Sequence, residues 1–477
     1  MLGIRLSNRF YFFAILLFCL VVIGLLGHTG HSPSQVLFWP LFEESGGTVE
    51  AGRRPPEPPT WTRLRQWEDN LPQHDLSLPF PEGNTGRYVK FDNQIKMLGW
   101  NNVLNEVLMN AHLSYVSGRS YVFLDYYWKP EYYSWPKSQF RSNPPRTPLN
   151  ALISGPAAGG PWDEGDEAPR AISERWYDIV CPYGERRFMN TREFKPPVWN
   201  SPGIDMLNHW SQVLRNAPER CIEIQGDDEH DMFPQVFDLW MWGSTRVLSL
   251  WEEFSKSPVS RLLQTSPVVK SAVDANEFLF YPRGSRLPLS NLGPRDPYDR
   301  MMAIHIRRGD FKEACMRLAY FNSTFYSWNL LPQLPDSFEV PPSLVWDSSE
   351  YNQYYVERCF PEQQSIVAKV REARKSYISA AGKDEKRTLD VMYLLTNAKG
   401  DWLAKMIAEL KQDGWHTIVT SKDLELNAEQ TDVNMAVDMD IARKAAVFIG
   451  NGWSSFTSNI VHRRLVDGKE PLSTRFW

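Results

Sequence analysis

The C-terminal half of the chain alternates short β-like runs with helical segments, and this alternation restricts the possible folds more than any other feature. The strand-like runs fall at residues 301–306, 391–395, 416–420 and 446–449. Helical segments are expected at about 402–411, 433–444 and 455–464. Strands joined through helices pair in parallel, so the pattern predicts a doubly wound α/β sheet with helices on both faces. Ligands bind such sheets outside the carboxyl ends of the strands.

Earlier in the chain the same pattern is weaker. A loop of sequence Gly-Trp-Asn-Asn at residues 99–102 precedes a helical run at 103–117 and a β-rich run at 119–124. These runs predict a loop–helix–strand unit. Residues 130–220 are rich in Pro, Gly and Trp and read as elaborated loops, for which periodicity predicts no element.

The N-terminal segment predicts a membrane anchor. Residues 10–27 carry no charge, and as a helix they would span roughly 26 Å, close to the thickness of a thin secretory-pathway bilayer. Arg5 and Arg9 precede the run, and the first charge after it is Glu43. The positive-inside rule therefore leaves residues 1–9 in the cytosol and the rest of the chain in the lumen. A cleaved signal peptide is the alternative, although the residues that follow form a poor cleavage site.

The overall composition fits a folded protein of two or three domains. The net charge of −5 gives no basic field, and the sequence has no local basic patch, so nucleic acid is not an expected partner. Residues 28–85 carry many prolines and few apolar runs. This composition predicts an extended stem with little packed structure.

The cysteines are consistent with a lumenal location. Besides the one in the expected anchor, the chain has four cysteines, an even number in an oxidising compartment. Sequence separation favours Cys181 with Cys221 and Cys315 with Cys359, but all three pairings and free buried thiols stay open. One N-glycosylation triplet, at residues 322–324, is a weak sign by itself because such triplets arise by chance.

A pair of cations follows the first predicted strand of the C-terminal half. The sequence from His305 to Asp310 places Arg307 and Arg308 where that strand ends, and guanidinium groups hold phosphate oxygens in a bidentate way. When a bond between a sugar carbon and a β-phosphate oxygen breaks, a fixed arginine stabilises the growing negative charge by about 3 kcal/mol. Taken alone, this motif is better explained by a surface ion pair between Arg308 and Asp310.

A second candidate anion site follows the last predicted strand. Residues 450–456, Gly-Asn-Gly-Trp-Ser-Ser-Phe, offer glycine backbone, the hydroxyls of Ser454 and Ser455, and a helix N-terminus, a combination that suits an anion. N-capping by one of the serines is the alternative, and it is compatible with phosphate bound nearby. Together the two strand ends can hold one diphosphate from both sides, with Arg307 on it.

These motifs resemble those of the protein O-fucosyltransferases and of a wider superfamily with α1,6-, plant and fungal members. The likeness covers about residues 95–125 and 300–465. It implies a GT-B-like α/β fold, in which two Rossmann-like domains face a cleft, here residues 86–290 and 291–477. It also implies GDP-fucose as the donor substrate, with no metal and no other cofactor.

The same resemblance assigns roles to individual residues. Asp438, 17 residues before Ser455, would read guanine together with His305, and Asn102 would face the β-phosphate and fucose. An N-cap is the alternative for Asn102. The residues implied to bind the donor are Asn101, Asn102, His305, Arg307, Arg308, Asp438, Ser454, Ser455 and Phe456.

The catalytic base departs from the family pattern. One branch has a glutamate just before the Gly/Asn-rich loop, whereas here residues 96–98 are Lys-Met-Leu. Glu106, four residues after Asn102 and on the same helix face, is the candidate replacement, so Arg307 and Glu106 are the candidate catalytic residues. The alternative for Glu106 is an exposed helix carboxylate without a catalytic part. Asp438 and Asp440 spell an Asp-x-Asp metal motif, but they fall in a predicted helix, so no metal site is expected.

The sequence therefore predicts a single-pass type II glycosyltransferase of the Golgi or endoplasmic reticulum, with its catalytic part in the lumen. The expected reaction is inverting transfer of fucose from GDP-fucose to a protein or glycan hydroxyl. One alternative is the same fold with another GDP-sugar, because the motifs read the nucleotide more firmly than the sugar. Another is a non-catalytic glycan-binding or scaffold protein that retains the nucleotide pocket, which the missing glutamate favours.

Overall fold

The computed structural model describes residues 57–227, 231, 233–281, 296–309, 311–382 and 387–477. The predicted cytosolic tail, the predicted anchor at 10–27 and the predicted stem up to residue 56 lie outside the described residues, as does Asp310. Within the described ranges, no helix is both long enough and apolar enough to cross a membrane.

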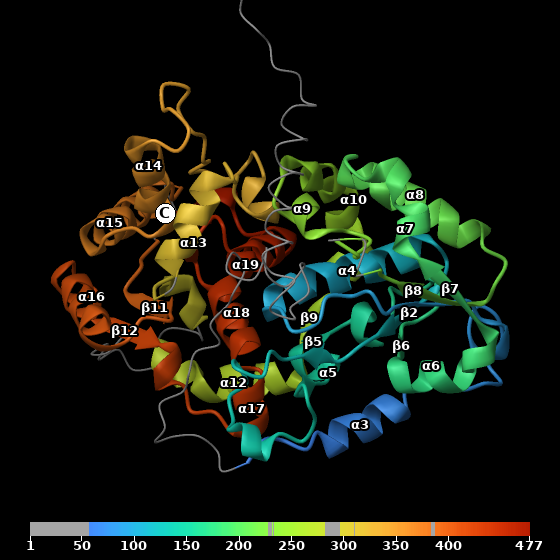
Figure 1. The fold of residues 1–477 in the computed structure, drawn as a ribbon. Helices are drawn as coiled ribbons and strands as arrows, with labels where there is room; N and C mark the ends of the chain where they lie inside the picture. Colours follow the sequence, from blue (N-terminus) through green and yellow to red (C-terminus); the bar gives the residue numbers. More distant parts are fainter. Residues whose placement is uncertain (1–56, 228–230, 232, 282–295, 310, 383–386) are drawn as a thin grey trace, which may run out of the picture.

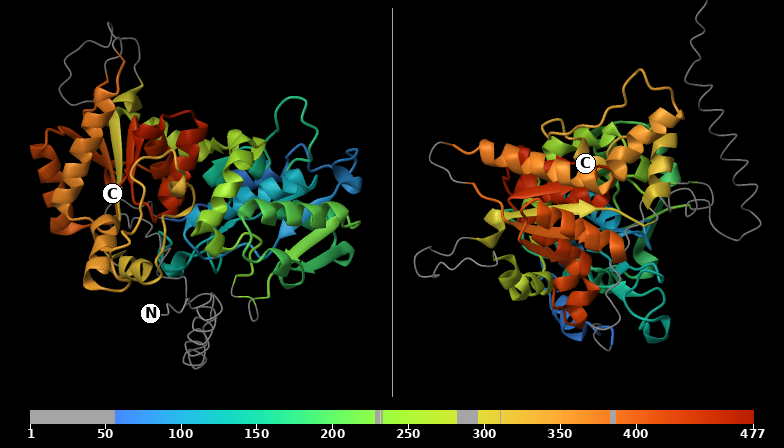
Figure 2. Two further views of the ribbon diagram at one scale, coloured as in Figure 1. Left: turned by 90° about the horizontal axis from the view of Figure 1, so that it is seen from above. Right: turned by 90° about the vertical axis from the view of Figure 1, so that its left-hand side faces the viewer.

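Two five-stranded parallel sheets form the two halves of the molecule, which lie side by side (Figures 1 and 2). The N-terminal sheet contains β1 (Tyr88–Phe91), β2 (Ser120–Phe123), β6 (Ile172–Ser173), β7 (Arg186–Asn190) and β8 (Cys221–Gln225), in the order β6-β2-β1-β8-β7. The C-terminal sheet contains β10 (Met301–Ile306), β11 (Val391–Thr396), β12 (Thr417–Thr420), β13 (Val447–Gly450) and β14 (Thr474–Phe476), in the order β12-β11-β10-β13-β14. The α/β class with parallel sheets is therefore confirmed.

Helices cover both faces of the C-terminal sheet. Along β10, Met302 and Ile304 pack in one apolar cluster with the helices α15 and α16, whereas Met301 and Ala303 join the main core on the other face. This alternation follows from the two-residue period of a strand. The helices of this half are α13 (Phe311–Tyr320), α14 (Ser349–Cys359), α15 (Gln363–Ser379), α16 (Gly400–Gln412), α17 (Ala428–Asp432), α18 (Asn434–Lys444) and α19 (Ser455–Val466).

The N-terminal sheet is covered in the same way by shorter elements. On one face lie α4 and α8, whose apolar side chains belong to the main core, and on the other lies α6. The main helices are α3 (Thr62–Asp69), α4 (Trp100–Val116), α6 (Glu174–Val180), α8 (Gly203–Asn216) and α12 (Pro267–Asn276). The short ones are α5 (Leu149–Leu152), α7 (Thr191–Phe194), α9 (Leu239–Trp242), α10 (Trp251–Lys256) and α11 (Pro258–Arg261). Two small antiparallel pairs, β3 (Tyr126–Tyr127) with β4 (Arg146–Thr147) and β5 (Ile153–Ser154) with β9 (Gln264–Thr265), complete this half.

The stem prediction is wrong for residues 57–85. Trp61 and Leu71 are buried in the main core, and Glu68 is 1% exposed. The Glu68 carboxylate accepts a hydrogen bond from Asn150 Nδ2 at 3.1 Å and pairs with Arg65 at 2.7 Å. The prolines that suggested a stem cluster before residue 60, and the apolar residues after them are enough to pack this segment onto the domain.

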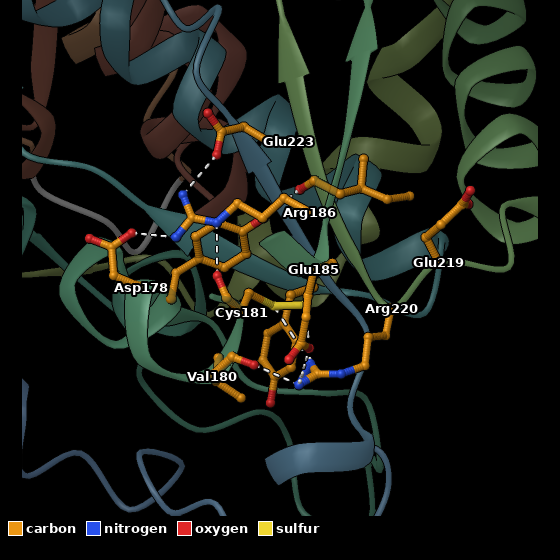
Figure 3. The surroundings of a disulfide bond; sticks show 12 residues. Asp178, Val180, Cys181, Glu185, Arg186, Glu219, Arg220 and Glu223 are labelled. Carbon is orange, nitrogen blue, oxygen red and sulfur yellow. Dashed lines mark hydrogen bonds and ion pairs between the residues drawn. A yellow bond between two sulfur atoms is a disulfide. The ribbon is translucent and has the colours of Figure 1, made fainter. Parts of the chain in front are cut away.

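Two disulfides join the pairs that sequence separation favours. Cys181–Cys221 ties the end of α6 to the start of β8, and Cys315–Cys359 ties α13 to the end of α14. Figure 3 shows the first bridge beneath Arg186, which pairs with the carboxylates of Asp178 and Glu223. The favoured pairing is therefore confirmed.

A buried arginine closes the amino-terminal edge of each sheet. Arg119, just before β2, donates from Nε to the Leu214 carbonyl at 2.9 Å and from Nη2 to the Ala217 carbonyl at 2.8 Å, and Nη1 reaches the Glu219 carbonyl at 2.9 Å. Arg464 does the same in the other half, where it donates to Thr474 Oγ1, to the carbonyls of residues 443, 445 and 446, and to the carbonyl and hydroxyl of Ser473. Both side chains are at most 1% exposed, so each fixes loops that precede strands of its own sheet.

Candidate functional site

The candidate site begins where the two central strands of the C-terminal sheet end. The chain leaves β10 towards β11 and β12 on one side and returns as β13 on the other side. In register, Ile304 of β10 pairs with Ile449 of β13. The residues after each strand therefore start next to each other, at the point where the strand order reverses, which is where ligands bind in open α/β sheets.

His305 joins the two motifs. Its Nδ1 lies 3.2 Å from Thr457 Oγ1, and its ring centroid lies 4.7 Å from that of Phe456. Trp477 Nε1 donates to the His305 carbonyl at 2.8 Å. Burial and the charge of Arg307 lower the pKa of His305 to about 3. The imidazole is therefore neutral at physiological pH, and the predicted proximity of the two motifs is observed.

The two arginines after β10 have different surroundings. The guanidinium of Arg307 lies 4.7 Å from the ring centroid of Phe311, at the start of α13. The guanidinium of Arg308 lies between the rings of Phe360 and Trp402, at 4.2 and 4.3 Å, and donates to the Pro361 carbonyl. Burial lowers the pKa of Arg308 to about 10. Arg308 thus stabilises the loop after α14, so that its contacts are structural.

The end of β13 and the loop after it are packed tightly at their glycines. A Cβ on Gly450 would lie 2.5 Å from the side chain of Thr457, and one on Gly452 would lie 2.3 Å from the ring of Phe325. Glycine is therefore required at both positions. Ser454 is the N-cap residue of α19, yet its side chain makes no capping hydrogen bond. Of the two serines offered as caps, Ser454 thus holds the N-cap position without capping through its side chain, and Ser455 is the first residue of the helix.

The predicted Gly/Asn-rich loop of the N-terminal half meets α19. Helix α4 begins at Trp100 with Gly99 as its N-cap, so the alternative of an N-cap role for Asn102 is wrong. Asn459 Nδ2, one turn after Ser455, donates to the Asn101 carbonyl at 2.8 Å. Asn101 and Asn102 are both buried. The structure therefore brings the first turns of α4 and α19 together.

Glu106 is buried in α4. It is 3% exposed, so the alternative of an exposed helix carboxylate is wrong. Its Oε2 accepts a hydrogen bond from the Ile95 backbone N–H at 2.8 Å, which holds the loop that leads into α4. Burial raises the pKa of Glu106 to about 8, although the bond from Ile95 and the charges of Lys195 and Lys96 lower it in part.

Lys195, near Glu106, is fully buried. Its Nζ donates to the Phe233 carbonyl and lies 3.5 Å from Asp231 Oδ2 and 3.9 Å from Asp238 Oδ2. Burial lowers the pKa of Lys195. No motif in the sequence indicated this ion-pair cluster, because Lys195 follows α7 whereas Asp231 and Asp238 lie in the later connection between β8 and α9.

Asp438 lies in the helix α18, as predicted. Its side chain contacts Tyr393 of β11. Its carboxylate accepts from the Tyr393 hydroxyl and, at 2.8 Å, from Ser421 Oγ. Burial raises the pKa of Asp438 to about 6. Asp440 has different partners and pairs with Arg443 at 2.7 Å. In the part of the chain that the structure describes, no group of three or more His, Cys, Asp or Glu side chains is placed to hold a metal ion.

Sequence reasoning missed two polar contributors to the site. Thr457 directly follows the second motif, and its position could have been noticed. Asn329, in the segment between α13 and α14, donates from Nδ2 to the carbonyls of Gly452 and Ser454, at 2.9 and 3.2 Å. Nothing in the local sequence around Asn329 signals that contact.

Comparison with known proteins finds similar chains among the solved structures. No protein-family model and no curated protein matches the chain. It is similar to solved fucosyltransferases. POFUT1 in complex with GDP-fucose has a TM-score of 0.46 and 14% identity, covering 82% of this chain and 97% of that one. Fucosyltransferase NodZ from Bradyrhizobium has a TM-score of 0.36 and 12% identity, covering 80% and 93%.

Proposed function

We propose that the chain is an inverting, metal-independent glycosyltransferase that transfers fucose from GDP-fucose to a hydroxyl of a protein or glycan. The observation that carries this proposal is that β10 and β13 end side by side, with His305 against Thr457 and Phe456, so that Arg307 and the loop 450–456 both follow strands that end at the reversal point of the C-terminal sheet. A cation and a helix N-terminus side by side suit a diphosphate. The motif resemblance supports guanosine and fucose, and it supports a GT-B-like arrangement with a cleft between residues 86–290 and 291–477.

In the proposed reaction the acceptor oxygen attacks C1 of fucose while the bond from C1 to the β-phosphate oxygen breaks. Arg307 stabilises the charge on the departing GDP, and Ser454, Ser455 and the first N–H groups of α19 bind the phosphates. The neutral His305 and the carboxylate of Asp438 select the guanosine. Phe456, Asn101 and Asn102 complete the donor site, and Arg308 holds its wall.

Glu106 is the proposed base for the acceptor proton. With a pKa of about 8, its carboxyl is mostly protonated at pH 7 and becomes a competent base as the pH rises through that value. The rate is therefore expected to increase with pH up to about 8 and then to level off.

The proposed cellular setting is the lumen of the Golgi or endoplasmic reticulum, with a single type II anchor at residues 10–27. The two disulfides support an oxidising compartment. The uncharged N-terminal run supports the anchor.

The deciding experiment is transfer by Arg307→Ala. Losing one fixed cation on the leaving group should lower the rate about 1,000-fold, with thermal unfolding and circular dichroism unchanged. Arg371→Ala is the matched control, because Arg371 is an exposed cation of the same half that pairs with Asp413. Full activity in Arg307→Ala would refute the proposed role.

A second candidate is a glycan-binding protein without turnover. The burial of Glu106 and its bond to Ile95 favour it, because both give that carboxylate a structural task. A donor screen with GDP-fucose, GDP-mannose and UDP-sugars, with and without EDTA, separates the candidates. Binding of GDP without turnover of any donor, across acceptor extracts, would support the second.

A further inference from the structure

Three aromatic side chains lie exposed together at the end of α13. We call Tyr320, Phe321 and Trp346 the aromatic patch; they are 41%, 40% and 55% exposed. The ring centroid of Tyr320 lies 5.2 Å from that of Phe321 and 5.5 Å from that of Trp346. Trp346 Nε1 donates to the Tyr320 carbonyl at 3.0 Å, which fixes the indole in place. Contiguous exposed apolar side chains mark a surface that another group covers.

Asn322, the first residue of the glycosylation triplet, follows the patch directly. Its backbone has a φ of 48° and its side chain is exposed. Its Oδ1 accepts from the hydroxyls of Tyr351 and Tyr355, at 2.9 and 3.2 Å. Its Nδ2 donates to no side chain or carbonyl among the residues that the structure describes. Hydrogen bonds to Oδ1 thus hold the side-chain amide in place and leave Nδ2 accessible for attachment of a sugar.

The residues after Asn322 turn inward. The Ser323 carbonyl accepts from the Tyr355 hydroxyl at 3.2 Å and from Trp453 Nε1 at 3.1 Å. Thr324 Oγ1 donates to the Gly243 carbonyl at 3.2 Å. The triplet is therefore fixed through Ser323 to Trp453 of the loop 450–456. Of its three residues, Asn322 is exposed, whereas Ser323 and Thr324 are partly buried.

We propose that Asn322 carries an N-linked glycan whose first sugars lie over the aromatic patch. In the transfer, Nδ2 forms a bond to C1 of a lipid-linked oligosaccharide, the bond from C1 to the lipid diphosphate breaks, the lipid diphosphate leaves, and one amide proton is lost. The inference rests on the lumenal location within the proposed function, and it is independent of the transfer activity.

A sugar suits the patch for chemical reasons. One face of a pyranose ring presents C–H groups, which pack on aromatic rings, while its hydroxyls remain in water. A glycan attached at Asn322 starts beside Phe321 and needs no further partner to reach Tyr320 and Trp346. The patch is then covered without a second protein.

The site is tested with the full chain made in a secretory host, by the mobility shift that peptide N-glycosidase causes. We expect a shift for the parent and for Ser323→Ala, which keeps the triplet, and no shift for Asn322→Gln. Pro136→Asn creates a second triplet in an exposed turn and reports lumenal entry. A shift in Pro136→Asn that is unchanged by adding Asn322→Gln would overturn the glycan and leave the lumenal location intact. No shift in any variant would overturn both.

The covering role is tested with a fluorescent dye that binds exposed apolar surface. Asn322→Gln is expected to bind at least about twice as much dye as the glycosylated parent, because the patch loses its cover. Adding Trp346→Ser should return the signal to the parent level. Equal dye binding by the parent and Asn322→Gln would overturn the covering role.

Discussion

The two halves of the molecule share one strand arrangement but use its carboxyl-terminal edge differently. In each, a five-stranded parallel sheet has its first strand, β1 or β10, in the centre, and the strand order reverses beside it. In the C-terminal half that edge carries Arg307 and the glycine-serine loop after β13. In the N-terminal half it carries a loop held by the buried Glu106, beside the buried Lys195.

This difference separates stabilising polar groups from groups suited to a ligand. Arg119 and Arg464 lie at the amino-terminal edges and use their donors on backbone carbonyls of the same half. The hydroxyl of Ser454, by contrast, makes no capping bond although it sits at a helix N-terminus. The arginines at the amino-terminal edges are thus used up on backbone carbonyls, whereas at least one polar side chain at the carboxyl-terminal edge of the C-terminal sheet is not needed to cap its helix.

The largest expected effect concerns the buried arginine that each half has at the amino-terminal edge of its sheet. Arg119→Met and Arg464→Met each leave several buried carbonyls without a donor, and each should lower the free energy of unfolding by about 3 to 5 kcal/mol. Urea-induced unfolding measures the loss, and native-state hydrogen exchange locates it. We expect each variant to expose mainly its own half. If either variant opened both halves equally, the two sheets would not be stabilised separately.

The next effect concerns Glu106, at the carboxyl-terminal edge of the N-terminal sheet. Glu106→Gln keeps an acceptor for the Ile95 N–H but removes the base, so transfer should fall about 100-fold and its rise with pH towards 8 should disappear. Because the folded state raises this pKa, the contribution of Glu106 to stability is complete below its unfolded pKa and is lost as the pH rises through about 8. The unfolding free energy of Glu106→Gln should therefore vary less with pH.

Glu252→Gln is the control for that prediction, because Glu252 is an exposed carboxylate of the same half. It should leave both profiles unchanged. An unaltered rate in Glu106→Gln, with weaker stability in Glu106→Ala, would make Glu106 a purely structural residue.

The smallest of these effects concerns Ser454, at the carboxyl-terminal edge of the C-terminal sheet. Ser454→Ala should raise the KM for the donor about 10- to 30-fold, since a hydrogen bond to a charged phosphate contributes about 1.5 to 2 kcal/mol. The melting temperature should stay the same, because the side chain makes no cap. Ser458→Ala on the same helix is the counterpart: its Oγ accepts from the Trp328 N–H at 3.1 Å. That variant should lower the melting temperature and leave the KM unchanged.

Four strands of the C-terminal half and the helices α16, α18 and α19 could be read from sequence, because the strands are short and apolar and these helices alternate with them along the chain, whereas α13, α14 and α15 were not predicted. β10 lies at the predicted positions, and β11, β12 and β13 differ by one residue. β14, only three residues long, was missed because it follows the last helix without a signal of its own. The favoured disulfides were also correct.

The N-terminal half was harder to read because its order comes from contacts distant in sequence. α6 and α8 lie within residues 130–220, where no element was predicted. α4 is packed between the two halves and is buried on almost every side from Trp100 to Ser114. Its polar residues are buried together with its apolar ones, so Glu106 could not be recognised as buried from its surroundings in the sequence.

One contact has a practical consequence for producing the protein. The carboxylate of Asp432, in α17, accepts from Thr147 Oγ1 at 2.6 Å and from Trp61 Nε1 at 3.2 Å, so the start of α3 is fastened to the last third of the chain. A gene shortened to start at residue 86 would remove Trp61 and Glu68 and leave their buried partners unsatisfied. A shortened version for crystallisation or donor screening should therefore begin at or before residue 57.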